Sequence, residues 1–230
     1  MKSQLPTHSL DGRPWAPVFS KLIFVVLVLL FWTFIGSFGI NTRVVPDLIS
    51  VLGAMTGPGA AAELWNHLAQ SLYLIGFGVL IGVLCAFVLT TLYMVWGPAA
   101  DVLDIIIAIL HPLPGIALLP IVMLLVGIGN AAIILIIVHS ILWPIVVNAV
   151  SGFKSVPKTQ IELGQNLGMS PARLVISVMT PNAFPNILAG LKIAWSRSWR
   201  ALVAAEMVFG ATGVDGGLGW FIYKKRYLME

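Results

Sequence analysis

The chain has 230 residues, of which 59% are hydrophobic and only 10% are charged. Soluble domains carry about 45–50% apolar and about 25% charged residues, so this composition excludes an ordinary water-soluble globule. The net charge of +4 comes from dispersed basic residues that mostly flank apolar segments, which argues against nucleic-acid binding. No hydrophilic block is long enough to fold separately, so we expect one all-α, polytopic membrane domain over residues 22–230.

Residues 1–17 are polar and contain prolines, and we expect residues 1–21 to form a cytoplasmic arm. No charge occurs from Leu22 to Ile40, a run of 19 residues. This length crosses a hydrocarbon core of about 30 Å as a helix. A signal peptide is the alternative, but its polar part would be unusually long and no A-x-A cleavage site follows. We therefore predict a retained first span.

A polar connection, Asn41–His67, separates the first span from the second, and its apolar piece 48–55 suits the membrane interface. The second span is predicted at Leu68–Met94. Its Gly78 and Gly82 form a G-x3-G pair, which either lets another helix approach closely or reflects the abundance of glycine in membrane helices. The same run contains the only cysteine, Cys85, which we expect to be buried.

Two spans are predicted between Ile105 and Phe153, because this stretch has no acidic or basic residue and is too long for one span. The break falls at 127–130, where glycines indicate a turn. The third span contains His111 and three prolines, namely Pro112, Pro114 and Pro120, so it should be kinked or partly unwound. The fourth contains His139 and Pro144. Each histidine is either a packed, hydrogen-bonded residue or a functional one, and both interpretations stay open.

A polar loop at residues 154–185 follows, and it has strong helix start and stop signals. Pro157 suits the first turn of a helix, and Gly168 suits a left-handed exit. Ser170 then caps a new helix with Pro171 at its first position. Pro181 and Pro185 close the segment and begin another helix. The pattern predicts two short helices held rigidly across a turn.

The fifth span, Ile187–Phe209, carries four charged residues: Lys192, Arg197, Arg200 and Glu206. Charges near the middle of a bilayer are costly unless they are paired or wetted, so these side chains should face a cavity or a partner. Lys192 lies near the helix end and can reach the interface instead. A flexible glycine-rich loop is expected at 210–219.

Basic residues predict the topology. Lys2, Arg13 and Lys21 place the N-terminus in the cytoplasm, and four spans then return the polar loop, with Lys154, Lys158 and Arg173, to the same side. The basic run at 224–226 does not fit this scheme, because it follows a fifth span.

Sequence signatures of catalysis are missing. The chain has no G-x4-G-K-[ST] phosphate-binding loop, G-x-S-x-G elbow, H-E-x-x-H pair or Cys/His metal spacing. Asp101 and Asp104 form its one carboxylate pair, which suits a helix cap or a solvated turn. We therefore expect a protein that is not an enzyme and holds no cofactor itself.

The polar loop resembles one protein family. Glu162, Gly168, Pro181, Pro185 and Gly190 have the spacing of the pattern E-A-A-x3-G-x9-I-x-L-P, with its following Pro and Gly, in permease subunits of bacterial binding-protein-dependent ABC importers. Leu163-Gly164 replaces the two alanines, and Met179-Thr180 precedes Pro181 where Ile/Leu-Leu is commoner. Segments 110–129 and 199–223 are similar to the nitrate, sulfonate and taurine branch. The resemblance covers residues 44 to 230.

This resemblance implies a type I ABC importer permease fold in the bacterial inner membrane, with five spans here and a sixth expected in the family. The chain stops at Glu230, where that helix would start, so either it is cut short or the last span is supplied differently. The polar loop would insert into a cleft of a separate ATPase dimer, which binds ATP and Mg. The implied coupling residues are Glu162, Leu163, Gly164, Gly168, Pro181, Pro185 and Gly190.

The resemblance further implies that two copies of the permease pair around a central path for a small anionic solute such as nitrate, a sulfonate or taurine. A periplasmic or lipid-anchored binding protein would deliver it. Candidate path or gate residues are Arg197, Arg200, Glu206, His111 and Pro114. The alternative is an ion-gradient-driven secondary transporter or channel, for which we would expect an inverted repeat that the sequence does not show. A structural scaffold would leave the charges of the fifth span unexplained.

Overall fold

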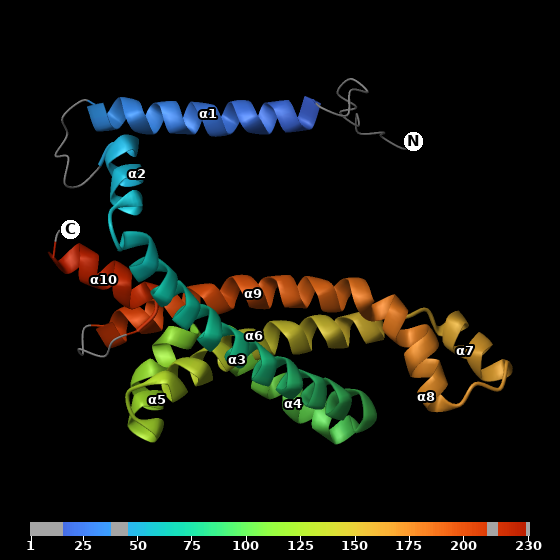
Figure 1. Ribbon diagram of the computed structural model, residues 1–230. Coiled ribbons are helices and arrows are strands. Elements are labelled where there is room, and N and C mark those ends of the chain that lie inside the picture. The colour runs from blue at the N-terminus through green and yellow to red at the C-terminus, as the bar shows by residue number, and fades with distance from the viewer. Residues whose placement is uncertain (1–15, 38–45, 211–215, 229–230) are drawn as a thin grey trace. The chain divides into compact units, whose positions relative to one another are not determined.

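The structure, a computed structural model, describes residues 16–37, 46–210 and 216–228, and the regular elements in these ranges are helices (Figure 1). The chain divides into two units, Met1–Glu63 and Leu64–Glu230. Four helices are long and apolar enough to cross a membrane, and a bent helix pair supplies a fifth candidate span. The predicted all-α membrane fold is confirmed.

The first unit holds α1 (Ala16–Ser37) and α2 (Leu48–Thr56). The first predicted span lies in α1, although its last residues, 38–40, fall outside the described ranges. Residues 1–15 of the predicted arm also fall outside them, whereas residues 16–21 are the first turns of α1. The apolar piece 48–55 forms α2, whose first turn is capped because Ser50 N donates to the carboxylate of Asp47.

Helix α3 (Ala60–Val95) begins two turns earlier than the predicted second span, so residues 60–67 are helical rather than part of a connection. Its G-x3-G pair packs on α6: a Cβ at Gly78 would lie 2.5 Å from Ile137 Cγ2, and one at Gly82 would overlap Ile141. Close helix approach is therefore the correct interpretation of the pair.

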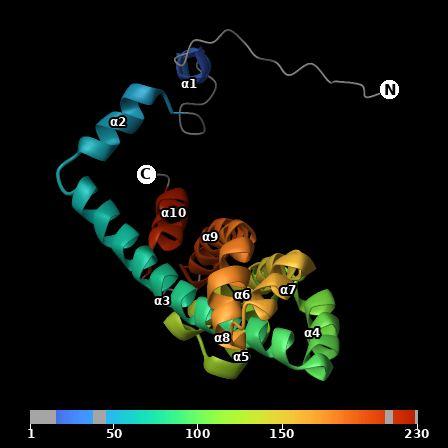
Figure 2. The ribbon, with the colours of Figure 1, turned by 90° about the vertical axis from the view of Figure 1, so that its right-hand side faces the viewer.

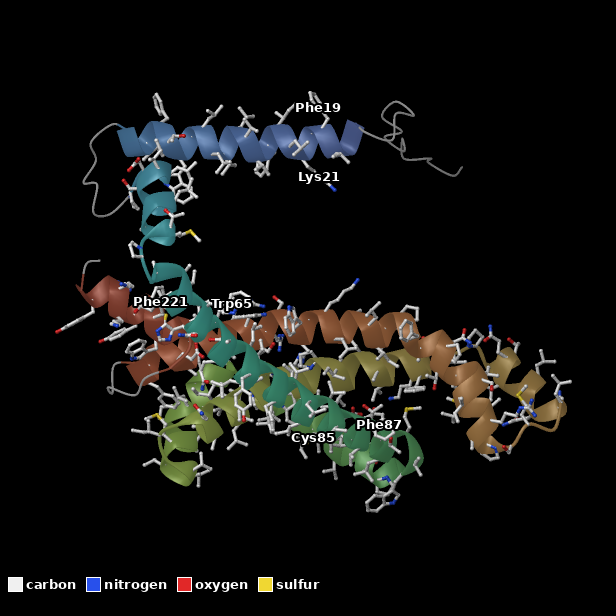
Figure 3. All side chains as sticks on the ribbon, viewed as in Figure 1. Phe19, Lys21, Trp65, Cys85, Phe87 and Phe221 are labelled. Atoms are coloured by element: carbon white, nitrogen blue, oxygen red, sulfur yellow. The ribbon has the colours of Figure 1, made fainter. Side chains whose placement is uncertain are left out.

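Other parts of the α3 surface are exposed: Phe87 projects from the side opposite Gly78, and Cys85 is exposed as well (Figure 3). The prediction that Cys85 is buried was wrong. An apolar run predicts a membrane span because lipid and protein interior are equally apolar, and it does not reveal which face packs on protein.

The third predicted span is broken. Helix α4 (Gly97–Leu110) ends before the two prolines, and the chain resumes as a 3-10 turn, η1 (Gly115–Leu118), and α5 (Leu119–Val126). The two halves make an angle of 91°. The expected interruption is confirmed, since Pro112 and Pro114 have no N–H to continue the helical hydrogen bonds. The turn after α5 also lies as predicted, with Gly127 at φ 80° and Gly129 at φ 145°.

Helices α6 (Asn130–Lys154) and α9 (Thr180–Gly210) run side by side as the centre of the second unit (Figures 1 and 2). Fully buried aliphatic side chains such as Ile136, Ile137 and Leu202 fill the core around them. The polar loop lies at one end of this pair, while α5 and α10 (Leu218–Leu228) lie toward the other end.

Candidate functional site

The first half of the polar loop is α7 (Lys158–Asn166), which ends in a closed turn. Gly168 has φ 70°, a left-handed conformation that glycine adopts without strain. Gly168 N donates to Gln165 O (2.9 Å) and Met169 N donates to Gly164 O (3.0 Å). These two bonds form a Schellman motif, which satisfies carbonyls that the helix end would otherwise leave free. The predicted glycine exit from this helix is confirmed in its backbone geometry.

The second half of the loop begins as predicted. Ser170 caps α8 (Pro171–Leu174) by accepting a hydrogen bond from Arg173 N. Leu174 packs over α7, where a Cβ at Gly164 would lie 2.5 Å from Leu174 Cδ1. The glycine that replaces an alanine of the family pattern is therefore buried beneath the second helix and lets the two halves touch.

The prediction of a separate, short second helix was wrong. After α8 the chain passes through a π-helical turn, η2 (Val175–Met179), directly into α9, so Pro171–Phe209 is one helical run. Pro181 is the second residue of α9, and Pro185 lies inside it. Proline normally breaks a helix by leaving a carbonyl free, but the π turn changes the bonding pattern here. The side-chain amide of Asn182 also donates to Val178 O (2.7 Å).

Gly190 lies outside the loop itself, in α9 against α6. A Cβ at this position would lie 2.8 Å from Asn148 Cβ and 3.1 Å from Pro144 O. One turn closer to the loop, Gly152 of α6 faces Ala183 of α9 in the same way. These close contacts pack α9, into which the loop continues, tightly against α6.

Large apolar side chains are exposed among the polar ones on the outer surface of the loop. Leu163, Leu167 and Ile176 are exposed by 60%, 69% and 70% of their surface. Glu162 is also exposed, at the side of Leu163 along α7. Such side chains outside a lipid-facing helix indicate an interaction surface.

A cavity of about 330 Å³ brings together four of the predicted path residues: His111, Pro114, Arg197 and Arg200. The break between α4 and α5 supplies the first two, and α9 supplies the arginines. Arg200 is oriented by its own helix, since its Nε donates to Ser196 O (3.2 Å).

Helix α6 contributes two further polar groups to this cavity. His139 and Trp143 lie one turn apart with their rings edge-to-face, 6.2 Å between centroids. Both ring nitrogens of His139 and the indole Nε1 of Trp143 are buried without a hydrogen-bond partner among the described residues. From the sequence we considered a functional role for His139 but not for Trp143. An aromatic residue in an apolar run gives no sign that its N–H lacks a partner.

Glu206, the fifth predicted path residue, does not line this cavity. It is only 1% exposed and lies where α3, α9 and α10 meet. Its carboxylate accepts hydrogen bonds from Ser71 Oγ (2.9 and 3.0 Å) and from Gly219 N (2.8 Å). Ser71 Oγ also accepts from Leu218 N (2.7 Å). Glu206 thus holds the first turn of α10, which begins inside the stretch 210–219 that we predicted to be flexible; residues 211–215 lie outside the described ranges.

A polar cluster that the sequence did not predict joins α3, α4 and α6. Tyr93 OH donates to Asp104 (3.0 Å to Oδ1), and Lys154 Nζ donates to Tyr93 OH (2.6 Å). Asp104 is therefore not a helix cap, since it lies inside α4. The sequence shows these polar residues near the ends of three spans, but it does not show that they pair with one another, because the pairing depends on tertiary packing.

Residues 78–226 match the family of binding-protein-dependent transport system inner membrane components. The chain belongs to this family. It is 33% identical over 194 residues to the taurine transport system permease protein TauC of Escherichia coli (strain K12), an alignment that covers 82% of this chain and 70% of TauC. It is 32% identical over 121 residues to the nitrate import permease protein NrtB of Synechococcus elongatus, covering 53% of this chain and 42% of NrtB.

A solved structure supports the same fold. The crystal structure of an amino acid ABC transporter with histidines superposes with a TM-score of 0.56 at 18% sequence identity, covering 79% of this chain and 91% of that chain. This protein is therefore an inner-membrane permease component of a binding-protein-dependent ABC importer, with an ABC permease fold, and not the catalytic subunit of that system.

Proposed function

We propose that this permease component conducts a small anionic solute and that residues 154–185 couple it to an ATPase dimer. The observation that carries the coupling proposal is the closed geometry of the loop. Its turn is fixed by the Gly168 Schellman motif, its halves touch at Gly164, and it presents exposed Leu163, Leu167 and Ile176. A rigid polar surface with exposed apolar side chains suits insertion into a cleft of a partner protein.

The loop has a mechanical link to the membrane helices. It continues without a break into α9, and Gly152 and Gly190 allow α9 to pack tightly on α6. Closure of an ATPase dimer that holds ATP and Mg would therefore tilt α6 and α9 as one body. A secondary transporter or channel, the alternative function, has no use for such a surface.

The proposed solute class rests on charge. Arg197 and Arg200 line the cavity together with two histidines, and none of the residues described at its lining is acidic. A transported cation would meet only repulsion there. The relatives named for taurine and nitrate handle solutes with oxyanion groups, which fits the same sign of charge. The solute would come from a periplasmic or lipid-anchored binding protein.

We further propose an orientation of the chain in the membrane and its pairing with a second copy. The N-terminus and the polar loop lie in the cytoplasm, as the basic residues at both places favour. A second copy of the permease completes the path, because the described part of the chain supplies four or five candidate spans and many of their apolar side chains are exposed.

Co-purification tests the coupling proposal. The full chain is isolated in detergent with candidate ATPase subunits, and wild type is compared with Gly168→Asp and Glu162→Ala. Asp at φ 70° is strained and places a charge on the loop, so the ATPase should be lost from the Gly168 variant and weakened in the Glu162 variant. Lys192→Gln, a charge change on α9 outside the loop, is the control. Equal recovery of the ATPase by all four proteins would overturn the proposal.

A further inference from the structure

The cavity beside the broken span contains more hydrogen-bond donors than its own residues can use. Arg197 forms no hydrogen bond or ion pair with any residue that the structure describes, and Arg200 uses only part of its guanidinium on Ser196. The indole N–H of Trp143 is buried without an acceptor. Buried polar groups are normally paired, so the Trp143 N–H calls for a partner that the described residues do not provide. Arg197 is half-buried and Arg200 is exposed, so their unused donors are open to a ligand in the cavity.

The donors converge from three parts of the fold. His111 lies at the break after α4, His139 and Trp143 lie on one face of α6, and the arginines lie one turn apart on α9. Arg197 is within electrostatic range of both imidazoles. Neither ring nitrogen of His139 has a partner among the described residues, so either can serve a ligand.

The charge of the cavity is uncompensated. Two guanidiniums face it and no described lining residue is a carboxylate. Placing two like charges in a membrane-embedded site is costly unless an opposite charge joins them. Guanidinium, indole N–H and imidazole N–H are all donors, and planar oxyanions accept two parallel hydrogen bonds from guanidinium. A volume of about 330 Å³ falls within the range of about 300–1,000 Å³ typical of small-molecule sites.

We propose that Arg197, Arg200, Trp143 and His139 form a binding site for the oxyanion group of the transported solute within a single chain, so that the permease itself selects for anions. This inference rests on the proposed function, because it takes the solute of that path as the ligand. It is more specific than a general attraction of anions by the positive charge of the cavity, because it assigns a discrete site with named donors. Trp143 is its most specific element, because an indole N–H has no charge and acts only by direct contact.

Equilibrium binding to the purified full chain tests the site. The chain is kept in dodecyl maltoside, which has no phosphate, with gluconate as the only other anion. Nitrate and methanesulfonate are titrated by calorimetry, and ethylammonium serves as the cation of similar size. We expect saturable binding of both anions and none of ethylammonium.

The variants separate charge from geometry. Arg197→Gln and Arg200→Gln should each weaken anion binding by about tenfold or more, the loss expected for one charge-assisted hydrogen bond. Arg197→Lys should retain part of the affinity, since it keeps the charge but not the paired donors. Trp143→Phe should weaken binding several-fold, and the control Lys192→Gln, which lies on α9 outside the cavity, should leave it unchanged.

Three results would overturn the proposal: no saturable anion binding to wild type, equal affinity in the glutamine variants and in Lys192→Gln, or competition by short-chain phosphatidylglycerol alone, which would assign the cavity to a lipid headgroup. The same preparations are assayed for ATPase co-purification. Retained ATPase with no anion binding would refute the site while the coupling proposal stands. Loss of the ATPase from wild type would refute the coupling proposal instead.

Discussion

The junction of α3, α9 and α10 allows a quantitative prediction about Glu206. Its carboxylate and Ser71 Oγ accept the N–H groups of Gly219 and Leu218, which are the first two residues of α10. Helix N-termini leave such groups free unless a side chain caps them, and here the caps come from two other helices. Rings add to the contact, since His67 of α3 lies 5.1 Å from the Trp220 ring, and Phe221 projects beside it (Figure 3).

Glu206→Ala should release α10 from the other helices. The change removes the acceptor of Gly219 N–H and a partner of Ser71, and hydrogen bonds to a charged group contribute about 1.5–3 kcal/mol each. Allowing for relaxation, we expect a loss of about 3 kcal/mol, which raises the undocked population about 100-fold. Glu206→Gln keeps an oxygen for Gly219 N–H, so it should cost about 1.5 kcal/mol or roughly tenfold.

Limited trypsin digestion measures this population, because Lys224, Lys225 and Arg226 all lie in α10. Release of the terminal peptide is followed by mass spectrometry under conditions in which cleavage tracks the open population. The rate should rise in the order wild type, Glu206→Gln, Glu206→Ala. Glu162→Ala, in the polar loop, is the matched control and should not change it. A wild-type cleavage rate in Glu206→Ala would refute the role of this carboxylate.

Three other sets of substitutions test the packing. Gly168→Ala should destabilise the loop by about 1–2 kcal/mol, and Gly168→Asn by less, because asparagine tolerates left-handed φ better; thermal unfolding in detergent measures both. Gly78→Ala should lower the unfolding temperature since its Cβ would overlap Ile137, whereas Gly76→Ala, with open space around it, should not; equal shifts would contradict the close approach of α3 and α6. Tyr93→Phe removes the hydroxyl that links Lys154 to Asp104 and should destabilise the protein by about 1–3 kcal/mol, and a neutral result would show that the cluster is dispensable.

Local signals in the sequence were sufficient for much of the fold. The broken third span follows from Pro112 and Pro114, and the turn after α7 follows from Gly168, because both effects act within a few residues. Helix α9 was harder to predict. Pro181 and Pro185 are ordinary stop signals, but the helical run passes both, with a π turn at Val175–Met179 just before Pro181.

The candidate site was predictable in part. Arg197 and Arg200 were predicted because a charged side chain inside the membrane is costly in free energy unless it has a partner or faces a cavity. The same reasoning grouped Glu206 with the arginines, although its carboxylate accepts hydrogen bonds from groups on α3 and α10 instead. One of these groups, Ser71, is 135 residues away in the sequence. Trp143 went unnoticed because only the packed structure shows that its N–H has no acceptor. Pairings across the fold depend on tertiary geometry that a local pattern does not contain.

Site-specific photo-crosslinking in native membranes tests the coupling role of the polar loop most directly. A photoreactive phenylalanine replaces Leu167, exposed at the tip of α7, or Val102, which is similarly exposed on α4 and serves as the control. We predict that position 167 captures a protein with a G-x4-G-K-[ST] nucleotide-binding loop, and that position 102 does not. Capture of that ATPase equally from both positions, or from neither, would contradict the account.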